Sequence, residues 1–352
     1  MSEKPLRVVV AGLGNMGRSH ALAYHRNPGF EIAALVNRSS VKLGQELAGY
    51  TVERSFEEAL KRERPDVASI NTYSDSHADY AVMALEAGAH VFVEKPLATT
   101  VKDAERVVAA AKANGRKLVI GYILRHHPSW QKLIAEARAL GGPYVFRMNL
   151  NQQSSGPTWE THKQLMQTTS PIVDCGVHYV DVMCQITDAK PVEVRGMGLR
   201  LSDEIATDMY NYGHLQVLFD DGSVGWYEAA WGPMISETAF FVKDIISPRG
   251  SVSIVMDEGA KSDDIDTHTK TATIRVHRAE RGPDGHFAAP DEILRMEGEP
   301  GHQELCEREQ AFLLRAIRED LDLTRHMEDA VQSLKICLAA DESVRTGRAV
   351  KL

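Results

Sequence analysis

The sequence predicts an α/β protein with two domains: a parallel sheet first, then an α+β domain with a large, mostly antiparallel open sheet. Two observations carry this prediction. In the first third, short β-branched runs alternate with helix-like segments, a pattern typical of parallel strands joined by crossover helices. After about residue 122 the pattern changes to one helical segment and then to runs of alternating polarity, which is typical of antiparallel strands. We therefore expect domains at residues 1–122 and 123–352.

The elements of the first domain can be placed by these patterns. Five strands are expected, at RVVVAG (7–12), EIAALVN (31–37), DVASINT (66–72), HVFVEKP (90–96) and KLVIGY (117–122). Helices are expected at 16–27 and at 76–88, where Ser76 stands at the start and Gly88 at the end. In the second domain, FDDGSVGW (219–226) predicts a hairpin and TATIRVHRA (271–279) a strand, whereas most of 257–300 is expected to form loops.

Composition and charge exclude several classes of protein. The 352 residues are too many for one ordinary core, and 43% of them are hydrophobic. With a net charge of −9, the protein is not expected to bind nucleic acid or an anionic membrane surface. The start has no signal-peptide pattern and no run is long enough to span a bilayer, so we expect a cytoplasmic protein. The four cysteines are scattered, without CxxC or zinc-type spacing, so neither disulfides nor a metal site is predicted.

The first chemical motif is VVVAGLGNMGRSH, with Gly12, Gly14 and Gly17 as G-x-G-x-x-G between a strand and a helix. This context predicts a dinucleotide site, because the glycines allow a tight turn and a close approach of pyrophosphate to the helix N-terminus. Asn15 and Met16 would then offer backbone N–H groups to the phosphates. The alternative is that the glycines only shape a strand-to-helix turn.

The end of the second strand bears on the choice of cofactor. An NAD-preferring site usually carries Asp or Glu there, whereas this sequence has Asn37 and Arg38. No carboxylate would repel a 2′-phosphate, and Arg38 could bind one, unless it is an ordinary surface arginine. The sequence therefore predicts NAD or NADP and leaves the preference open.

The second motif, HVFVEKPLAT, ends a buried strand in Glu94, Lys95 and Pro96. Ligands of open parallel sheets bind at the carboxyl ends of the strands, so Lys95 is expected beside the nicotinamide. Pro96 restricts Lys95 to extended geometry and so limits the movement of its ammonium group. The alternative is a solvated lysine paired with Glu94.

The third motif is IVDCGVHYVDVMCQI (172–186), whose strongly polar residues are Asp174, His178, Asp181 and Gln185. Their spacing of i, i+4, i+7 and i+11 puts them on one narrow stripe of a helix that is otherwise apolar. Such a helix is buried on most sides, and its polar stripe is either a structural network or part of a reaction site.

These motifs together resemble the Gfo/Idh/MocA family of NAD(P)-dependent oxidoreductases. The resemblance rests on AGLGNMGRSHA, EKP at 94–96, GYILRHHP at 121–128 and DCGVHYVD at 174–181, in this order and spacing. It implies an N-terminal Rossmann domain and a C-terminal domain whose open sheet often mediates oligomers, here a homodimer or homotetramer. It also implies that a substrate site between the domains contains Lys95, Asp174 and His178, with Arg125 as a frequent substrate contact. Two departures are Asn37 and the segment TTSPIVDCGVHY, which stands where many members are glycine-rich.

The chemistry of alcohol oxidation explains these residue types. A proton must leave oxygen as hydride leaves carbon, and His178 is the natural acceptor at neutral pH. Lys95 would stabilise negative charge on oxygen, and Asp174 would fix the tautomer of the imidazole. We expect Asp181 to be structural, as a cap for a neighbouring backbone group. Asn151 is a further candidate for binding the substrate. Other residues that could shape the pocket are Tyr122, His127, Trp159 and Trp231.

Three functions are compatible with the sequence. The favoured one is a dehydrogenase or reductase acting on a secondary hydroxyl or ketone of a carbohydrate or cyclic polyol. The alternative is an NAD-dependent glycosidase that oxidises its sugar transiently, with no net change of cofactor. The third is a sugar-sensing regulator without catalysis, which is disfavoured because Lys95 and His178 are both present.

Overall fold

A computed structural model of the chain describes residues 4–236, 241–256 and 271–352. The chain divides into two compact units. The first contains Met1–Ile123 and His302–Val331, and the second contains Leu124–Gly301 and Gln332–Leu352. The sequence pattern indicated a single boundary after residue 122 and gave no sign that a C-terminal segment returns to the first unit.

The sheet of the first unit has six strands in the order β3-β2-β1-β4-β5-β6, all paired in parallel. The order reverses at β1, so the carboxyl ends of β1 and β4 flank a switch point of the kind at which α/β folds bind ligands. The predicted parallel sheet is confirmed, with all five expected strands present. The bounds are β1 (Leu6–Ala11), β2 (Phe30–Val36), β3 (Val52–Glu53), β4 (Val67–Ile70), β5 (His90–Val93) and β6 (Leu118–Ile120).

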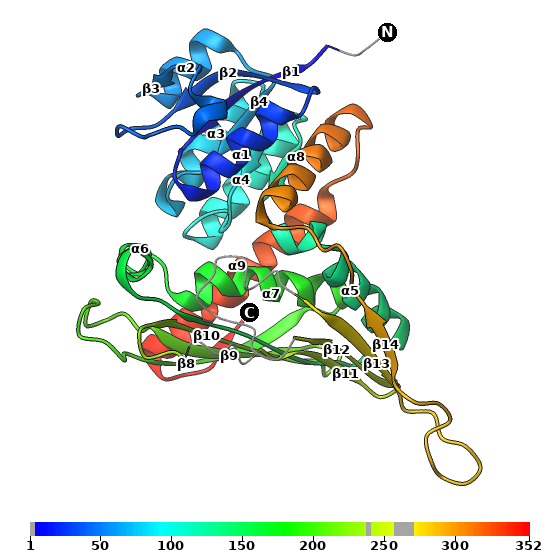
Figure 1. Ribbon diagram of the computed structural model, residues 1–352. Helices are drawn as coiled ribbons and strands as arrows, with labels where there is room; N and C mark the ends of the chain where they lie inside the picture. The colour runs from blue at the N-terminus through cyan, green and yellow to red at the C-terminus, as the bar shows by residue number, and fades with distance from the viewer. Residues whose placement is uncertain (1–3, 237–240, 257–270) are drawn as a thin grey trace. The chain divides into compact units, whose positions relative to one another are not determined.

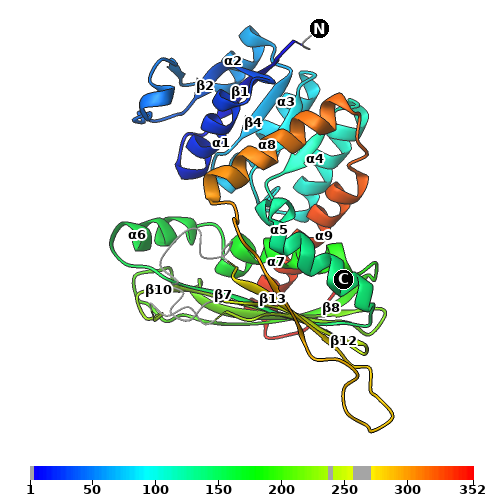
Figure 2. The same ribbon diagram turned by 45° about the vertical axis from the view of Figure 1, so that its right-hand side comes forward.

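Helices from both ends of the chain complete the first unit. They are α1 (Asn15–Arg26), α2 (Phe56–Glu63), α3 (His77–Glu86), α4 (Val101–Ala113), α8 (His302–Arg318) and the first part of α9 (Thr324–Thr346). Figures 1 and 2 show α8 lying beside α1, with which it packs. Leu313 of α8 belongs to the same hydrophobic core as Val8 and Val10 of β1. The C-terminal segment is therefore part of the core of the first unit, because α8 packs on α1 and Leu313 is buried in the same apolar cluster as residues of β1.

Ser76 stands at the N-cap position of α3, as expected, but its side chain does not cap the helix. Ser76 precedes α3, but its hydroxyl makes no cap hydrogen bond to the helix and lies 2.7 Å from Thr72 Oγ1 and 2.9 Å from Tyr73 O. A short 3-10 turn, Ser74–Ser76, leads into the helix and gives Ser76 a helical backbone, which explains the difference. Gly88 follows the helix with a φ of +88°, as a glycine after a helix end commonly does.

Within the described residues, the sheet of the second unit has nine strands in the order β14-β13-β12-β11-β7-β10-β9-β8-β15. Every neighbouring pair is antiparallel except β7 with β10, so the predicted, mostly antiparallel sheet is confirmed. The predicted hairpin joins β9 to β10, and Gly222 supplies the positive φ of its turn, +85°. The bounds are β7 (Val145–Gln153), β8 (Pro191–Leu199), β9 (Tyr212–Phe219), β10 (Val224–Gly232), β11 (Lys243–Ser247), β12 (Gly250–Val255), β13 (Thr273–Arg278), β14 (Glu292–Arg295) and β15 (Val350–Lys351).

In the part of the chain that the structure describes, four helices accompany this sheet: α5 (Pro128–Leu140), α6 (Gly156–Leu165), α7 (Pro171–Ile186) and the later part of α9. Figures 1 and 2 show α5 and α7 on the same face of the sheet, where α7 packs on β10 and α5 on β12.

The expectation of loops over residues 257–300 needs correction. Strand β14 lies in this segment, paired with β13, and was missed because it is only four residues long and lies in a polar, turn-rich context. Residues 257–270 lie outside the described part of the chain. Among the described residues, no helix combines the length and apolarity needed to cross a membrane.

Candidate active site

The glycine turn joins β1 to α1, and its three glycines meet different constraints. Gly12 has a φ of +83°, and a Cβ there would lie 2.4 Å from the carbonyl oxygen of Asn71. A Cβ on Gly17 would lie 1.8 Å from the carbonyl oxygen of Gly12. A Cβ on Gly14 would meet no described atom within 4 Å. Gly12 and Gly17 are thus required by packing, whereas packing within the described chain does not explain Gly14.

The N-terminus of α1 fits a pyrophosphate. The helix begins at Asn15 after Gly14, so no side chain caps its first N–H groups, and its first turn carries no acidic residue. Those N–H groups and the positive end of the helix dipole favour an anion. The open space at Gly14 lets a phosphate approach the backbone. The residues present therefore fit the dinucleotide that the sequence predicted.

The end of β2 is held by Asn37. Its Oδ1 accepts a hydrogen bond of 3.0 Å from the backbone N–H of Leu13, and its Nδ2 donates to the carbonyl oxygen of Ser39 at 2.8 Å. Arg38 is exposed. Arg54, which follows β3, donates to the carbonyl oxygen of Arg38 at 2.8 Å and to Ser40 Oγ at 3.1 Å. Sequence reasoning missed Arg54, because β3 is only two residues long and its pairing with β2 leaves no local pattern.

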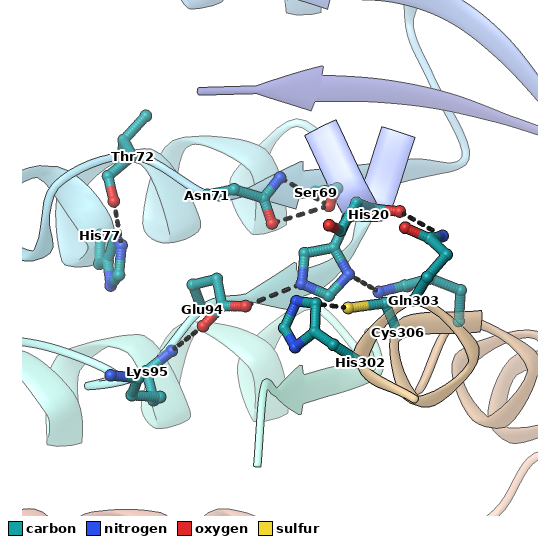
Figure 3. Close-up of polar contacts among 12 residues, drawn as sticks. His20, Ser69, Asn71, Thr72, His77, Glu94, Lys95, His302, Gln303 and Cys306 are labelled. Carbon is teal, nitrogen blue, oxygen red and sulfur yellow. Dashed lines mark hydrogen bonds and ion pairs between the residues drawn. The ribbon is translucent and has the colours of Figure 1, made fainter. Parts of the chain in front are cut away.

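At the end of β5, the carboxylate of Glu94 faces the interior and is only 5% exposed (Figure 3). Its Oε1 lies 2.7 Å from His20 Nε2, and its Oε2 accepts from the backbone N–H of Lys95 at 3.0 Å. Burial raises the pKa of Glu94, but the hydrogen bond from His20 and the charge of Lys95 outweigh this and lower it overall. Lys95 itself is half-buried, and its peptide bond to Pro96 is cis. The buried His20–Glu94 pair therefore fixes the backbone that presents Lys95.

A second histidine connects the loops after β4 and β5. His77 Nε2 lies 2.9 Å from the carbonyl oxygen of Thr72 (Figure 3). His77 Nδ1 lies 2.7 Å from the carbonyl oxygen of Pro96. Burial lowers the pKa of His77, although the two carbonyls oppose the shift. Both neighbours of Lys95 in the chain are therefore held in place: Glu94 by His20, and Pro96 by His77.

In the second unit, α7 has the predicted burial: every residue from Pro171 to Ile186 is buried except Gln185. Ser170 caps the helix by accepting from the N–H of Val173 at 3.1 Å, and its hydroxyl donates to Asp341 at 2.8 Å. Asp174 and His178 are 9% and 7% exposed, one helical turn apart. The Sγ of Cys175 lies 3.7 Å from Asp174 Oδ2. A hydrogen bond from the His178 ring N–H to the Asp174 carboxylate stays a prediction.

Asp181 forms a buried ion pair with Arg125. Arg125 Nε and Nη2 lie 2.8 and 2.5 Å from the two oxygens of Asp181, and Gln185 Nε2 donates to the same carboxylate at 2.9 Å. Sequence reasoning expected Asp181 to cap a backbone group, whereas these partners are side chains. It treated Arg125 as a substrate contact and did not predict this pair, because the two residues lie on different helical segments.

Two polar clusters lie on the sheet of the second unit. Asn151 Nδ2 donates to Glu228 Oε1 at 2.5 Å, and Asn151 Oδ1 is buried without a hydrogen-bond partner among the described residues. In the second cluster, Trp231 Nε1 donates to Gln152 Oε1 at 3.1 Å, and the ring of His162 stacks on Trp231 at 4.3 Å and 8°. Burial lowers the pKa of His162 to about 4, and Asp174 opposes the shift. Sequence reasoning missed Gln152 and His162, which come together only through the fold.

The predicted site residues separate by unit. The predicted cofactor residues Gly12, Gly14, Asn15, Met16, Gly17, Asn37, Arg38, Glu94 and Lys95 lie in the first unit. The predicted substrate residues Arg125, Asn151, Asp174 and His178 lie in the second. Of the aromatic residues considered for the pocket, Tyr122 is only 1% exposed and packs against His326 in the core of the first unit.

Comparison with known protein families identifies the family of the chain. The oxidoreductase family with an NAD-binding Rossmann fold matches residues 6–122, and the GFO/IDH/MocA C-terminal domain matches residues 131–242. The chain therefore belongs to the Gfo/Idh/MocA family of oxidoreductases, as its motifs predicted, and the family's NAD-binding fold agrees with the predicted dinucleotide cofactor.

Named relatives agree with this family. The chain is 30% identical over 169 residues to the 4-carboxy-2-hydroxymuconate-6-semialdehyde dehydrogenase of a Sphingobium species, covering 45% of the chain and 54% of the relative. It is 27% identical over 186 residues to the inositol 2-dehydrogenase of Salmonella typhimurium, covering 51% and 53%. The chain thus spans about half the length of these two relatives. The scyllo-inositol dehydrogenase of Lactobacillus casei, solved with NAD(H) and scyllo-inositol, has the same fold: TM-score 0.76, 18% identity, 99% of both chains.

The glycine turn gives a first prediction. Gly14→Ala should leave the melting temperature of the free protein unchanged, because its Cβ meets nothing, but should weaken NAD(P)H binding at the phosphates. Gly17→Ala should instead lower the melting temperature, because its Cβ collides with the Gly12 carbonyl. Thermal shift with and without NADH or NADPH measures both. Equal losses of stability in the two variants would show that Gly14 is also a packing residue.

Cofactor choice gives a second prediction. If Arg38 binds a 2′-phosphate, Arg38→Ala should weaken NADPH binding by about tenfold or more and NADH binding far less, because only one ligand loses a charged contact. Arg54→Ala should show the same selectivity more weakly, since Arg54 contacts the Arg38 carbonyl. Fluorescence titration with both nucleotides measures this, with Arg116→Ala as the control arginine. Equal losses for NADH and NADPH would make Arg38 a bystander.

The buried His162 gives a third prediction. Its folded pKa of about 4 lies below the unfolded value near 6.5, so the unfolded chain takes up this proton first as pH falls. The contribution of His162 to the free energy of unfolding is fully present above about pH 6.5. It declines as the pH falls towards 4, by at most about 3 kcal/mol. His162→Phe keeps a ring against Trp231 and should flatten the melting temperature between pH 6.5 and 4. As a control, substitution of the exposed His286 by Phe should leave this pH dependence as it is in the wild type. Identical curves of melting temperature against pH for the wild type and His162→Phe would contradict the low pKa of His162.

Proposed function

We propose that this protein is an NAD(P)-dependent oxidoreductase that transfers hydride between its cofactor and a secondary hydroxyl or ketone of a carbohydrate or cyclic polyol. The observation that carries the proposal is α7, which keeps a carboxylate and an imidazole one turn apart inside the second unit. Family membership, and relatives named as inositol dehydrogenases, support the substrate class. Buried ionisable side chains at a site of this kind are candidates for acid–base chemistry.

The first unit supplies the cofactor site. The N–H groups at the start of α1, including those of Asn15 and Met16, would bind the pyrophosphate, and Gly14 would leave room for it. Arg38 follows the end of β2, where the ribose is expected, and Arg54 donates to the Arg38 carbonyl, so these two arginines are proposed to lie near the ribose. When bound, the nicotinamide accepts or donates the hydride.

The second unit supplies the proton acceptor. His178 takes the hydroxyl proton during oxidation and returns it during reduction. Asp174 favours the imidazolium that forms, since a carboxylate one helical turn away stabilises positive charge. In this proposal Lys95 stabilises negative charge on the substrate oxygen, and the His20–Glu94 pair holds its backbone in place.

Two further residues are proposed to bind the substrate. Asn151 has a buried amide oxygen with no hydrogen-bond partner among the described residues, and a sugar hydroxyl could donate to it. Arg125 is also proposed as a contact, although Nε and Nη2 are bonded to Asp181. A cytoplasmic location and a homodimer or homotetramer remain predictions.

A panel of free sugars, inositols and glycosides, incubated with NAD or NADP, tests the proposed function. We expect NAD(P)H to accumulate at 340 nm with at least one free sugar or polyol. Release of free sugar from a glycoside without net change of cofactor would instead establish the NAD-dependent glycosidase. Nucleotide and sugar binding without any turnover would contradict both and favour a regulator.

Substitution of Lys95 gives a fourth prediction. Lys95→Met keeps the length and apolar bulk of the side chain, so the melting temperature should be nearly unchanged, and NAD(P)H binding should weaken far less than turnover. Turnover should fall by about 10²- to 10⁴-fold, the usual loss for a charge-stabilising or proton-transferring group. Lys102→Met, an exposed lysine of the same unit, is the matched control. If Lys95→Met keeps more than about a tenth of the activity, the lysine is structural.

A further inference from the structure

A cluster of possible metal ligands lies in the interior of the first unit, between α1 and α8. It consists of His20 on α1 with Cys306 and Glu309 on α8. One side-chain donor atom from each of the three lies within 4.8 Å of the others, and all three residues are buried. We call these residues the α1–α8 cluster. The oxidoreductase function proposed above does not use Cys306 or Glu309.

The spacing on α8 suits a single ion. His302, Cys306 and Glu309 follow one another as i, i+4 and i+7, so they share one face of the helix. Figure 3 shows His302 and Cys306 together beside His20, and Cys306 Sγ lies 3.6 Å from His302 Nε2. Thiolate and imidazole ligands at zinc distances, about 2.3 and 2.0 Å in tetrahedral geometry, lie about 3.5 Å apart. This pair therefore already has the separation that two ligands of one zinc ion require.

His20 has the orientation of a ligating histidine. Its Nδ1 lies 2.9 Å from Gln310 Nε2, and since an amide nitrogen only donates, Nδ1 is the acceptor and directs its lone pair towards α8. The ring proton is then on Nε2, which donates to Glu94 Oε1 at 2.7 Å. Metal-binding histidines usually donate their second N–H to a carboxylate in this way. Glu94 thus stands where the outer carboxylate of a metal site would be, and the amide of Gln310 would move aside.

Glu309 supplies the independent observation that points to a ligand. It is 1% exposed, and neither of its carboxylate oxygens has a hydrogen-bond partner among the described residues. A buried carboxylate without a partner is unfavourable, and the nearby Glu94 adds a like charge. A divalent cation would supply both the missing contacts and the missing positive charge.

We propose that His20, Cys306 and Glu309 bind a zinc-class divalent cation. One imidazole, one thiolate and one carboxylate fill three of the four tetrahedral positions of Zn²⁺, and His302 Nε2, 3.6 Å from Cys306 Sγ, would have to move closer to the other two ligands to take the fourth. The ion would join α8, from the C-terminal part of the chain, to the helix that follows the glycine turn. The sequence pattern did not indicate this site, because Cys306 and Glu309 share one helix while His20 lies near the other end of the sequence.

Cobalt substitution of the full-length protein tests the proposal. After removal of bound metal with a chelator, Co²⁺ should bind with a stoichiometry of one and produce a near-ultraviolet thiolate charge-transfer band, which Zn²⁺ then abolishes by displacement. Zn²⁺ should also raise the melting temperature of the metal-free protein. Absence of the band and of the zinc-dependent thermal shift in the wild-type protein would overturn the proposal.

Variants locate the ion. Cys306→Ser should remove the charge-transfer band, whereas Cys337→Ser, a buried thiol of the second unit, should retain it. Glu94→Gln should keep the band but weaken metal binding by about 10- to 100-fold, as loss of an outer hydrogen-bond partner does. If Cys306→Ser does not fold, Glu309→Gln decides, because it preserves shape and should weaken Co²⁺ binding at least about tenfold. Binding unaffected by Glu309→Gln, or a band lost in Cys337→Ser and kept in Cys306→Ser, would refute the site.

Discussion

The ion pair between Arg125 and Asp181 is the interaction on which the second unit depends. Asp181 is fully buried, and without a counter-charge its carboxylate would oppose the burial of α7. Arg125 meets both oxygens at 2.8 and 2.5 Å, and Gln185 adds a third hydrogen bond. Breaking such a pair from one side typically costs about 3–5 kcal/mol. Because this charge is neutralised, the helix can bring Asp174 and His178 into the interior with it.

The first unit also contains a buried carboxylate that needs partners, at the end of β5. Glu94 is buried beside a half-buried Lys95, and His20 holds one carboxylate oxygen while the backbone N–H of Lys95 holds the other. His20 is in turn fixed by Gln310 of α8, a residue from the other end of the chain. The position of Lys95 therefore depends on α8 as well as on β5. This explains why a Rossmann-type unit here includes residues beyond 300.

The sequence predicted those features that local periodicity or a short motif encodes. The five main strands of the first unit, the hairpin at Gly222 and the buried α7 each follow from residues that are close in sequence. Missed features depend on residues far apart: Arg54 near Arg38, Arg125 with Asp181, and His162 stacked on Trp231. Side-chain partners of this kind are set by tertiary packing, which no single segment records. Gly14 is the opposite case: the sequence motif singled it out, but no packing contact among the described residues requires a glycine there.

Our main proposal is that Lys95 and His178 act on the same substrate hydroxyl. A double-mutant cycle of kcat/KM with Lys95→Met, His178→Ala and the combined variant tests it most directly. Groups that act on the same proton are strongly non-additive, so the combined variant should lose far less than the product of the two single losses. Single losses of about 10²- to 10⁴-fold that multiply fully in the combined variant would contradict the claim, because the two residues would then act independently.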